Sequence, residues 1–189
     1  MNIVKRLRMI MSVSIAMAVA LAPGVSFAES GNGPSFPGVP NIPLDNKISF
    51  NGFFKSHQPV KIVWAIGQPG VQATESLWNA ALVIKYLQAH HYKYRIHIVL
   101  YSKGVLLADV FSSHFNTCGP LLRKLHAAGV TFTVCHNAMY LFHVRTKDLY
   151  PFMHPIPAGI LSVVEYEMRG YSPIYNPNSV TPTYKSPLG

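Results

Sequence analysis

Short β-branched runs alternate with segments of helical periodicity through the middle of the chain, and this alternation strongly limits the folds that it can adopt. Apolar runs rich in Val, Ile and aromatic side chains, typical of buried strands, cover residues 60–66, 94–101 and 130–135. Apolar residues recur every three or four positions, as on amphipathic helices, at about residues 75–90, 118–128 and 158–169. This order predicts βαβ units, and therefore a single α/β/α layered domain with a mainly parallel sheet of four or five strands.

The last of these helices and the shorter elements carry more specific predictions. Helical spacing indicates that the buried side of the last helix is formed by Ile160, Leu161, Val164 and Met168. Shorter helices are expected near residues 105–111 and 137–144. Residues 155–157 can form at most a short strand, because a proline cannot donate a hydrogen bond to a neighbouring strand.

The two ends of the chain differ in composition from this central region. Residues 1–28 combine a basic start, an apolar run and small residues up to Ala28, the pattern of a cleavable secretory signal. A retained membrane anchor is the alternative, but the apolar run is shorter than the roughly 20 residues that a spanning helix needs. Pro- and Gly-rich residues 29–57 predict a flexible leader, residues 58–177 the folded domain, and residues 178–189 an irregular tail. We therefore expect an exported protein of the bacterial periplasm, with no membrane span in the mature chain.

The charges and motifs of the chain exclude several functional classes. Of sixteen basic residues three lie in the predicted signal, which leaves thirteen against seven acidic residues. These basic residues are scattered, whereas a nucleic-acid-binding protein concentrates them on one face, so no nucleic-acid partner is expected. The chain has neither a phosphate-binding loop of the required spacing nor a G-x-S-x-G motif, and we expect no cofactor.

Two cysteines are the strongest candidates for chemistry. Cys135 ends a predicted strand and Cys118 begins a predicted helix, so both should lie at the edge of the sheet where the parallel strands end. The positive end of a helix dipole favours thiolate over thiol there, and His136 and His114 are close in sequence. Alternatively, Cys135 is a small apolar residue that closes a strand, or the two cysteines form a disulfide in an oxidising compartment.

A metal site is the remaining alternative for these side chains. Zinc accepts the ligand types of Cys118, Cys135, His114 and His136. The nine histidines do not show the spacing of a recognised ligand set, however, and no short paired-ligand motif is present. We therefore predict no metal.

The region around Cys135 is similar to a known family. Residues 129–139, GVTFTVCHNAM, resemble the G-V-x-F-x-V-C-x-N-T-M stretch of the DsrE/DsrF-like (YchN-like) family. The first strand, Asn79 in the first helix, and the P-A-G-I…R-G-Y pattern of residues 157–171 also match. The resemblance covers about residues 58–177.

This resemblance implies an α/β/α domain that assembles into trimers or hexamers, with a persulfide carried on Cys135. It also suggests Asn137 as a ligand-binding residue, and His114, in the loop before Cys118, is a second candidate from its position. Three hypotheses follow. In the first, the chain is a sulfur carrier or thiol-redox protein with His136 as activator, Cys118 as resolving thiol, and a sulfur-donor or acceptor protein as partner. In the second, it is a non-catalytic module that binds a small ligand. In the third, it is a structural oligomeric subunit.

Overall fold

A five-stranded, all-parallel sheet forms the centre of the protein, which confirms the predicted fold class. The computed structural model describes residues 36–39, 50–112 and 116–176. The strand order is β4-β3-β2-β1-β5, and every pair of neighbouring strands is parallel. The strands are β1 (Val60–Ile66), β2 (Tyr94–Leu100), β3 (Thr131–Cys135), β4 (Met153–Ile156) and β5 (Ser172–Tyr175).

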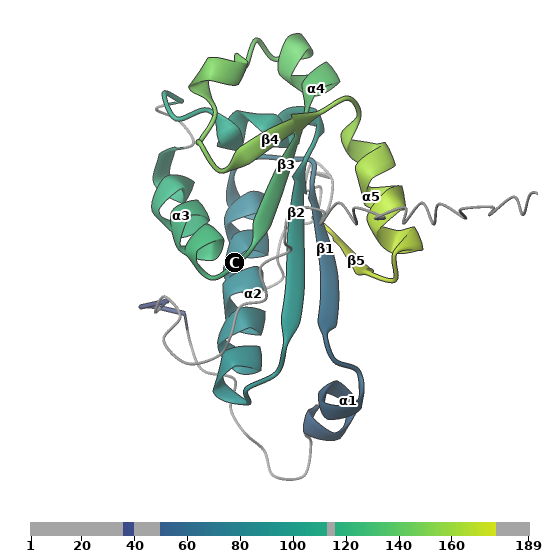
Figure 1. Cartoon of the computed structure of the whole chain (residues 1–189). Helices are drawn as coiled ribbons and strands as arrows, with labels where there is room; N and C mark the ends of the chain where they lie inside the picture. The colour runs from purple at the N-terminus through teal and green to yellow at the C-terminus, as the bar shows by residue number, and fades with distance from the viewer. Residues whose placement is uncertain (1–35, 40–49, 113–115, 177–189) are drawn as a thin grey trace, which may run out of the picture.

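Helices cover the two faces of this sheet unequally (Figure 1). Helices α2 and α3 lie on one face, and α5 is the one described helix on the other, against β1, β2 and β3. Short 3-10 helices η1, η2 and η3 complete the loops. The helices are α1 (Asn51–Ser56), α2 (Val71–Ala89), α3 (Gly119–Ala127), α4 (His136–Leu141), α5 (Gly159–Met168), η1 (Ser102–Ala108), η2 (Asn116–Cys118) and η3 (Thr146–Asp148). None of the helices in the described residues is long and apolar enough to cross a bilayer.

Most predicted elements are present, and the differences concern their ends. Helix α2 begins four residues earlier than predicted, because its first turn carries an exposed Val71 that does not belong to the apolar stripe. The helix expected at 105–111 is the earlier 3-10 helix η1. The short strand near residues 155–157 is present as β4.

The face covered by α2 and α3 contains the main core. Every second residue of the central strands points to it, as the period of two along a strand requires. Fully buried side chains from both helices fill the space above them. The largest fully buried side chains of this core, from the two helices and the strands, include Leu77, Ile84, Leu87, Ile98, Leu122, Leu125 and Phe132.

The prediction for the buried side of α5 is wrong. The four apolar residues predicted to be inward are exposed, with exposed fractions of Ile160 52%, Leu161 67%, Val164 46% and Met168 85%. The side facing the sheet instead contains the small residues Gly159, Ser162 and Val163, with Tyr166 half-buried. Helical periodicity identifies an apolar stripe but not what covers it, and here the close approach of Gly159 to the sheet turns the stripe outward.

Two elements lie in segments for which the sequence predicts no regular structure. Strand β5 pairs in parallel with β1 at the edge of the sheet, where Pro173 is tolerated. Within the predicted leader, α1 forms a short helix, and Phe36 and Val39 are buried in the core. Part of the Pro- and Gly-rich segment is therefore packed on the domain.

Candidate functional site

Cys135 lies where β3 ends and α4 begins, at the edge formed by the carboxyl ends of the parallel strands. It pairs with Ile156 of β4, and His136 starts the helix immediately after it. Its exposed fraction is 8%. In open α/β sheets ligands bind beyond this edge, so the backbone places the sulfur at the usual position of a reactive group, although the side chain is largely covered.

The cover over Cys135 is the first turn of α5. A Cβ atom added to Gly159 would lie 3.0 Å from Cβ of Cys135 and 2.7 Å from Cβ of Tyr101. Real Cβ atoms do not approach within 2.7 Å, and 3.0 Å is already a tight contact, so only a glycine lets the start of α5 lie this close to the two side chains. The positive end of the helix dipole therefore faces the region of the Cys135 thiol.

Tyr101 forms the second wall and is held by the loop after β2. Its backbone N–H donates to the carbonyl oxygen of Ile66 at 3.1 Å, and Gly104 N–H donates to the Gly67 carbonyl at 3.1 Å. A Cβ on Gly104 would lie 2.1 Å from the Ile66 oxygen, so this loop lies directly on the end of β1. The ends of three neighbouring strands thus converge around Cys135.

Cys118 lies at the same edge of the sheet, next to the first turn of α2. It ends η2 and precedes α3, and its Sγ lies 3.5 Å from Oγ1 of Thr74 in the first turn of α2. Cys135 instead has the strand parity of Thr131 and Thr133, which hydrogen-bond to a histidine on the α5 face. Both cysteines are buried free thiols. Cβ of Cys135 thus lies against the start of α5 and Sγ of Cys118 against the start of α2, while both residues belong to the main buried core.

The other predicted site residues are exposed or lie outside the described residues. His136 and Asn137 are exposed on the first turn of α4, next to Cys135 in the chain. His114 lies outside the described residues. In the part of the chain that the structure describes, no group of three His, Cys, Asp or Glu side chains is arranged to hold a metal ion.

Sequence reasoning missed Tyr101, Gly159 and Thr74 as neighbours of the two thiols. Tyr101 could have been found, because it directly follows β2 and must therefore lie at the same edge as the end of β3. The contacts of Gly159 and Thr74 depend on how α5 and α2 sit on the sheet, and no local pattern signals them.

A buried polar cluster lies on the α5 face, around His97. The ring nitrogens of His97 lie 2.7 Å from Thr131 Oγ1 and 2.9 Å from Thr133 Oγ1, and its ring stacks on Tyr166 at 4.0 Å. Burial lowers the pKa of His97 from 6.5 to about 3, so the imidazole is neutral near pH 7. Burial also raises the pKa of Tyr166. Both groups are therefore uncharged, and each histidine nitrogen has a hydroxyl partner.

Comparison with known proteins agrees with this architecture. The sequence model of the DsrE/DsrF-like family matches residues 61–174. Among solved structures, the chain is similar to MTH1491, a protein of unknown function from Methanobacterium thermoautotrophicum, with a TM-score of 0.53 and 21% identity. That similarity covers 61% of this chain and 98% of MTH1491, and at this identity it shows the fold alone. The comparison with curated protein sequences found no significant match. Because the family model matches more than half of the sequence, the chain belongs to the DsrE/DsrF-like family.

Proposed function

We propose that this chain is a carrier of sulfane sulfur, or a thiol-redox protein, that uses the thiol of Cys135. The observation that supports this most directly is the position of Cys135 at the carboxyl end of β3, against the first turn of α5. A reactive thiol needs a positive environment and a route to solvent. The start of α5 supplies the positive environment, and the carboxyl edge of the sheet lies close to solvent.

The transfer step needs no cofactor. The Cys135 thiolate attacks the outer sulfur of a donor persulfide, R–S–S⁻, and forms a new S–S bond to it. The bond between the two donor sulfurs breaks, and R–S⁻ leaves with its electron pair. Cys135 then holds the outer sulfur as a persulfide, which an acceptor thiolate removes by the same exchange.

The burial of Cys135 favours one alternative. With only 8% of the residue exposed, a bulky donor cannot reach the sulfur unless the start of α5 moves. A non-catalytic module of the same fold, which binds a small ligand or assembles as a structural subunit, needs no such movement. In that case Cys135 is a packing residue, as buried free cysteines often are.

Mass spectrometry of the intact protein separates these functions. We expect polysulfide treatment to add the mass of one or more sulfur atoms to wild type and to Cys118→Ser, and none to Cys135→Ser. The Cys118→Ser variant is the matched control, because it removes the other buried thiol at the same edge of the sheet. Unmodified thiols after polysulfide treatment would support the non-catalytic module, and a Cys118–Cys135 disulfide in protein purified without reductant would contradict the carrier.

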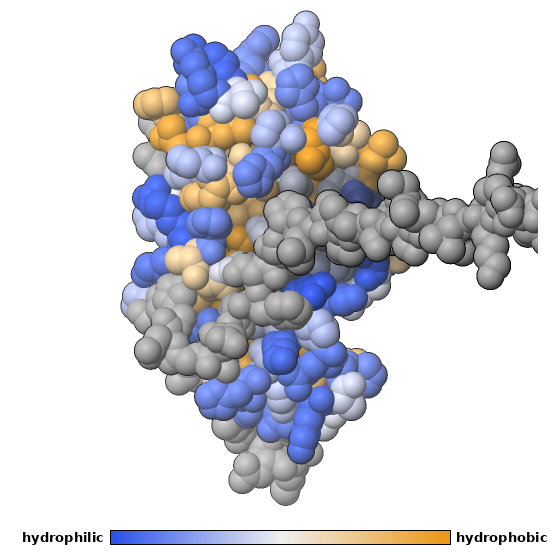
Figure 2. Space-filling view, viewed as in Figure 1, coloured by the Kyte–Doolittle hydropathy of each residue, from blue (hydrophilic) through white to orange (hydrophobic). Residues whose placement is uncertain are grey.

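Assembly into a homo-oligomer is part of the proposal. The exposed apolar stripe of α5 suits burial against a second copy of the chain, since contiguous apolar surface of this kind marks interaction sites. In the view of Figure 2, apolar surface gathers toward the carboxyl edge of the sheet, while the end around α1 is mostly hydrophilic. Light scattering should show trimers or hexamers, and Val164→Asp should reduce them to monomers. A wild-type monomer at every concentration would contradict this assembly.

Export is also proposed, from the composition of residues 1–28. Expression with the native start in a bacterial host should yield a periplasmic protein that begins at Glu29, as N-terminal sequencing would show. A full-length protein in the cytoplasmic fraction would contradict export. The compartment matters for the chemistry, because a persulfide on Cys135 is more easily oxidised outside the reducing cytoplasm.

A further inference from the structure

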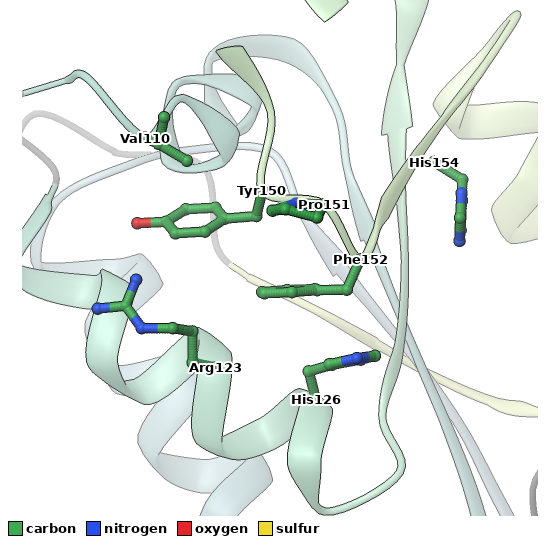
Figure 3. Close-up of a pocket in the computed structure, with 7 residues that line it drawn as sticks. All are labelled: Val110, Arg123, His126, Tyr150, Pro151, Phe152 and His154. Carbon is green, nitrogen blue, oxygen red and sulfur yellow. The ribbon is translucent and has the colours of Figure 1, made fainter. Parts of the chain in front are cut away.

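A groove between α3 and the start of β4 is lined by an aromatic stack and a cation. Its volume is about 860 Å³, within the range of roughly 300–1,000 Å³ that is usual for ligand pockets. Figure 3 shows the rings of Tyr150, Phe152 and His126 one above another, with Arg123 extending from α3 toward Tyr150. The lining residues are Val110, Arg123, His126, Tyr150, Pro151, Phe152 and His154.

The rings of the groove are held in nearly parallel planes. His126 stacks on Phe152 with ring centroids 4.4 Å apart and an interplanar angle of 9°. Phe152 stacks on Tyr150 with centroids 5.5 Å apart and an angle of 24°. The buried ring of Phe132 meets Phe152 edge-on at 5.5 Å and supports the stack from the core. The rings therefore form a rigid wall before any ligand binds.

The charge of the groove is unbalanced. The Arg123 guanidinium lies 5.6 Å from the centroid of the Tyr150 ring. Within the described residues it forms no ion pair, and no carboxylate is among the lining side chains. A guanidinium presents a planar fork of donors that matches a carboxylate, and a ring face beside it limits its orientations. The groove thus offers an oriented positive charge next to aromatic surface.

We propose that this groove binds a small planar aromatic carboxylate. The ligand ring packs against the wall formed by Phe152 and His126, and its carboxylate accepts hydrogen bonds from Arg123. Apolar ring surface with one charge at its end matches the two features of the groove, whereas a neutral aromatic compound would leave Arg123 unpaired.

This site is separate from the proposed sulfur chemistry. The groove includes the start of β4, where Met153 pairs with Phe132, whereas Cys135 pairs with Ile156 at the other end of the strand. Three strand residues correspond to about 10 Å. Cys135 is not among the residues that line the groove, and its Cβ lies against the start of α5 instead. Failure of either proposal leaves the other intact.

Titration of 2-naphthoate into the ¹⁵N-labelled protein, followed by amide chemical shifts, tests the inference. We expect saturable shifts at residues of α3 and at the start of β4. Arg123→Gln should weaken binding by about 10- to 100-fold, the usual effect of losing a charged hydrogen bond. Lys124→Gln is the matched control, because it removes the same charge from the same helix while its side chain lines a different cleft. This variant should bind like wild type.

Two further compounds define the chemical class. 2-Naphthylmethanol, which has the same ring and no charge, should bind at least about tenfold more weakly than naphthoate. AMP also combines a planar ring system with a negative charge, but it is larger, so it tests whether the groove prefers a larger anion to a small aromatic carboxylate. The inference is overturned if naphthoate causes no saturable shifts, if Arg123→Gln binds it like wild type, if naphthylmethanol binds equally well, or if AMP binds more tightly.

Discussion

The two faces of the sheet are built differently, although they share the same strands. On the α2 and α3 face, large apolar side chains fill a continuous core. On the α5 face the described residues give a small buried apolar cluster of Val63, Ala65, Val99 and Val163, and a histidine with two threonines lies beside it. The helix that covers this second face has its larger apolar side chains on its outer side.

This difference separates stability from function. Apolar burial is the dominant favourable contribution to folding, so the α2 and α3 face should supply most of the stability. The α5 face holds Cys135 and the neutral His97, and its helix has apolar surface left for another chain. The buried histidine and the proposed reactive thiol thus lie next to the helix with the smaller buried apolar cluster, α5. Four changes test this division, from the largest expected effect to the smallest.

The largest effect is expected from Leu77→Ala on α2. Leu77 is fully buried in the main core, and truncation of such a residue costs about 2–5 kcal/mol of unfolding free energy. Urea unfolding followed by circular dichroism measures this loss. A cost below about 1 kcal/mol would show that the α2 face does not dominate stability.

Acidification should destabilise the α5 face through His97. The unfolded chain binds a proton at this residue near pH 6.5, while the folded protein does so only at about pH 3. The contribution of His97 to the unfolding free energy is therefore fully present above pH 6.5 and is lost between pH 6.5 and 3, by up to about 1.4 kcal/mol per pH unit. Urea unfolding at several pH values measures this slope in the wild type. In His97→Gln the slope should correspond to about one fewer proton taken up on unfolding. Equal slopes would contradict the assignment.

Gly159→Ala should cost about 1–3 kcal/mol, because the added Cβ would collide with Tyr101 and Cys135 and displace α5. Gly52→Ala is the control. A Cβ there meets no atom within 4 Å, so it should leave stability unchanged or raise it by up to about 1 kcal/mol. Thermal unfolding compares the two variants. If Gly159→Ala were as harmless as the control, α5 would not be held against Cys135 as described.

The smallest effect is expected from Leu161→Ala on the outer side of α5. The side chain is 67% exposed, so the unfolding free energy of the monomer should change by less than about 0.5 kcal/mol. Measurement in dilute protein keeps assembly from contributing. A loss comparable with that of Leu77→Ala would mean that this stripe is buried within the monomer.

The parts of the fold that follow from local patterns were predictable. The strands β1, β2 and β3 were located within about one residue, because long β-branched runs with turn signals reflect burial on both faces of a parallel sheet. Strand β5 was missed, because its four residues include a proline and are all exposed. The position of Cys135 at the carboxyl edge followed from the order of the elements alone.

The contacts around the two sites did not follow from local patterns. Helical spacing located α5 but not its rotation, which depends on the approach of Gly159 to Tyr101 and Cys135. The groove combines Arg123 of α3 with Phe152, which are brought together because β4 pairs beside β3. Periodicity and composition report the burial of each segment, and they established an α/β domain with a thiol at the edge of its sheet. Which side chains meet is decided by packing between segments that are distant in sequence, so only the folded chain revealed the cover over Cys135 and the aromatic groove.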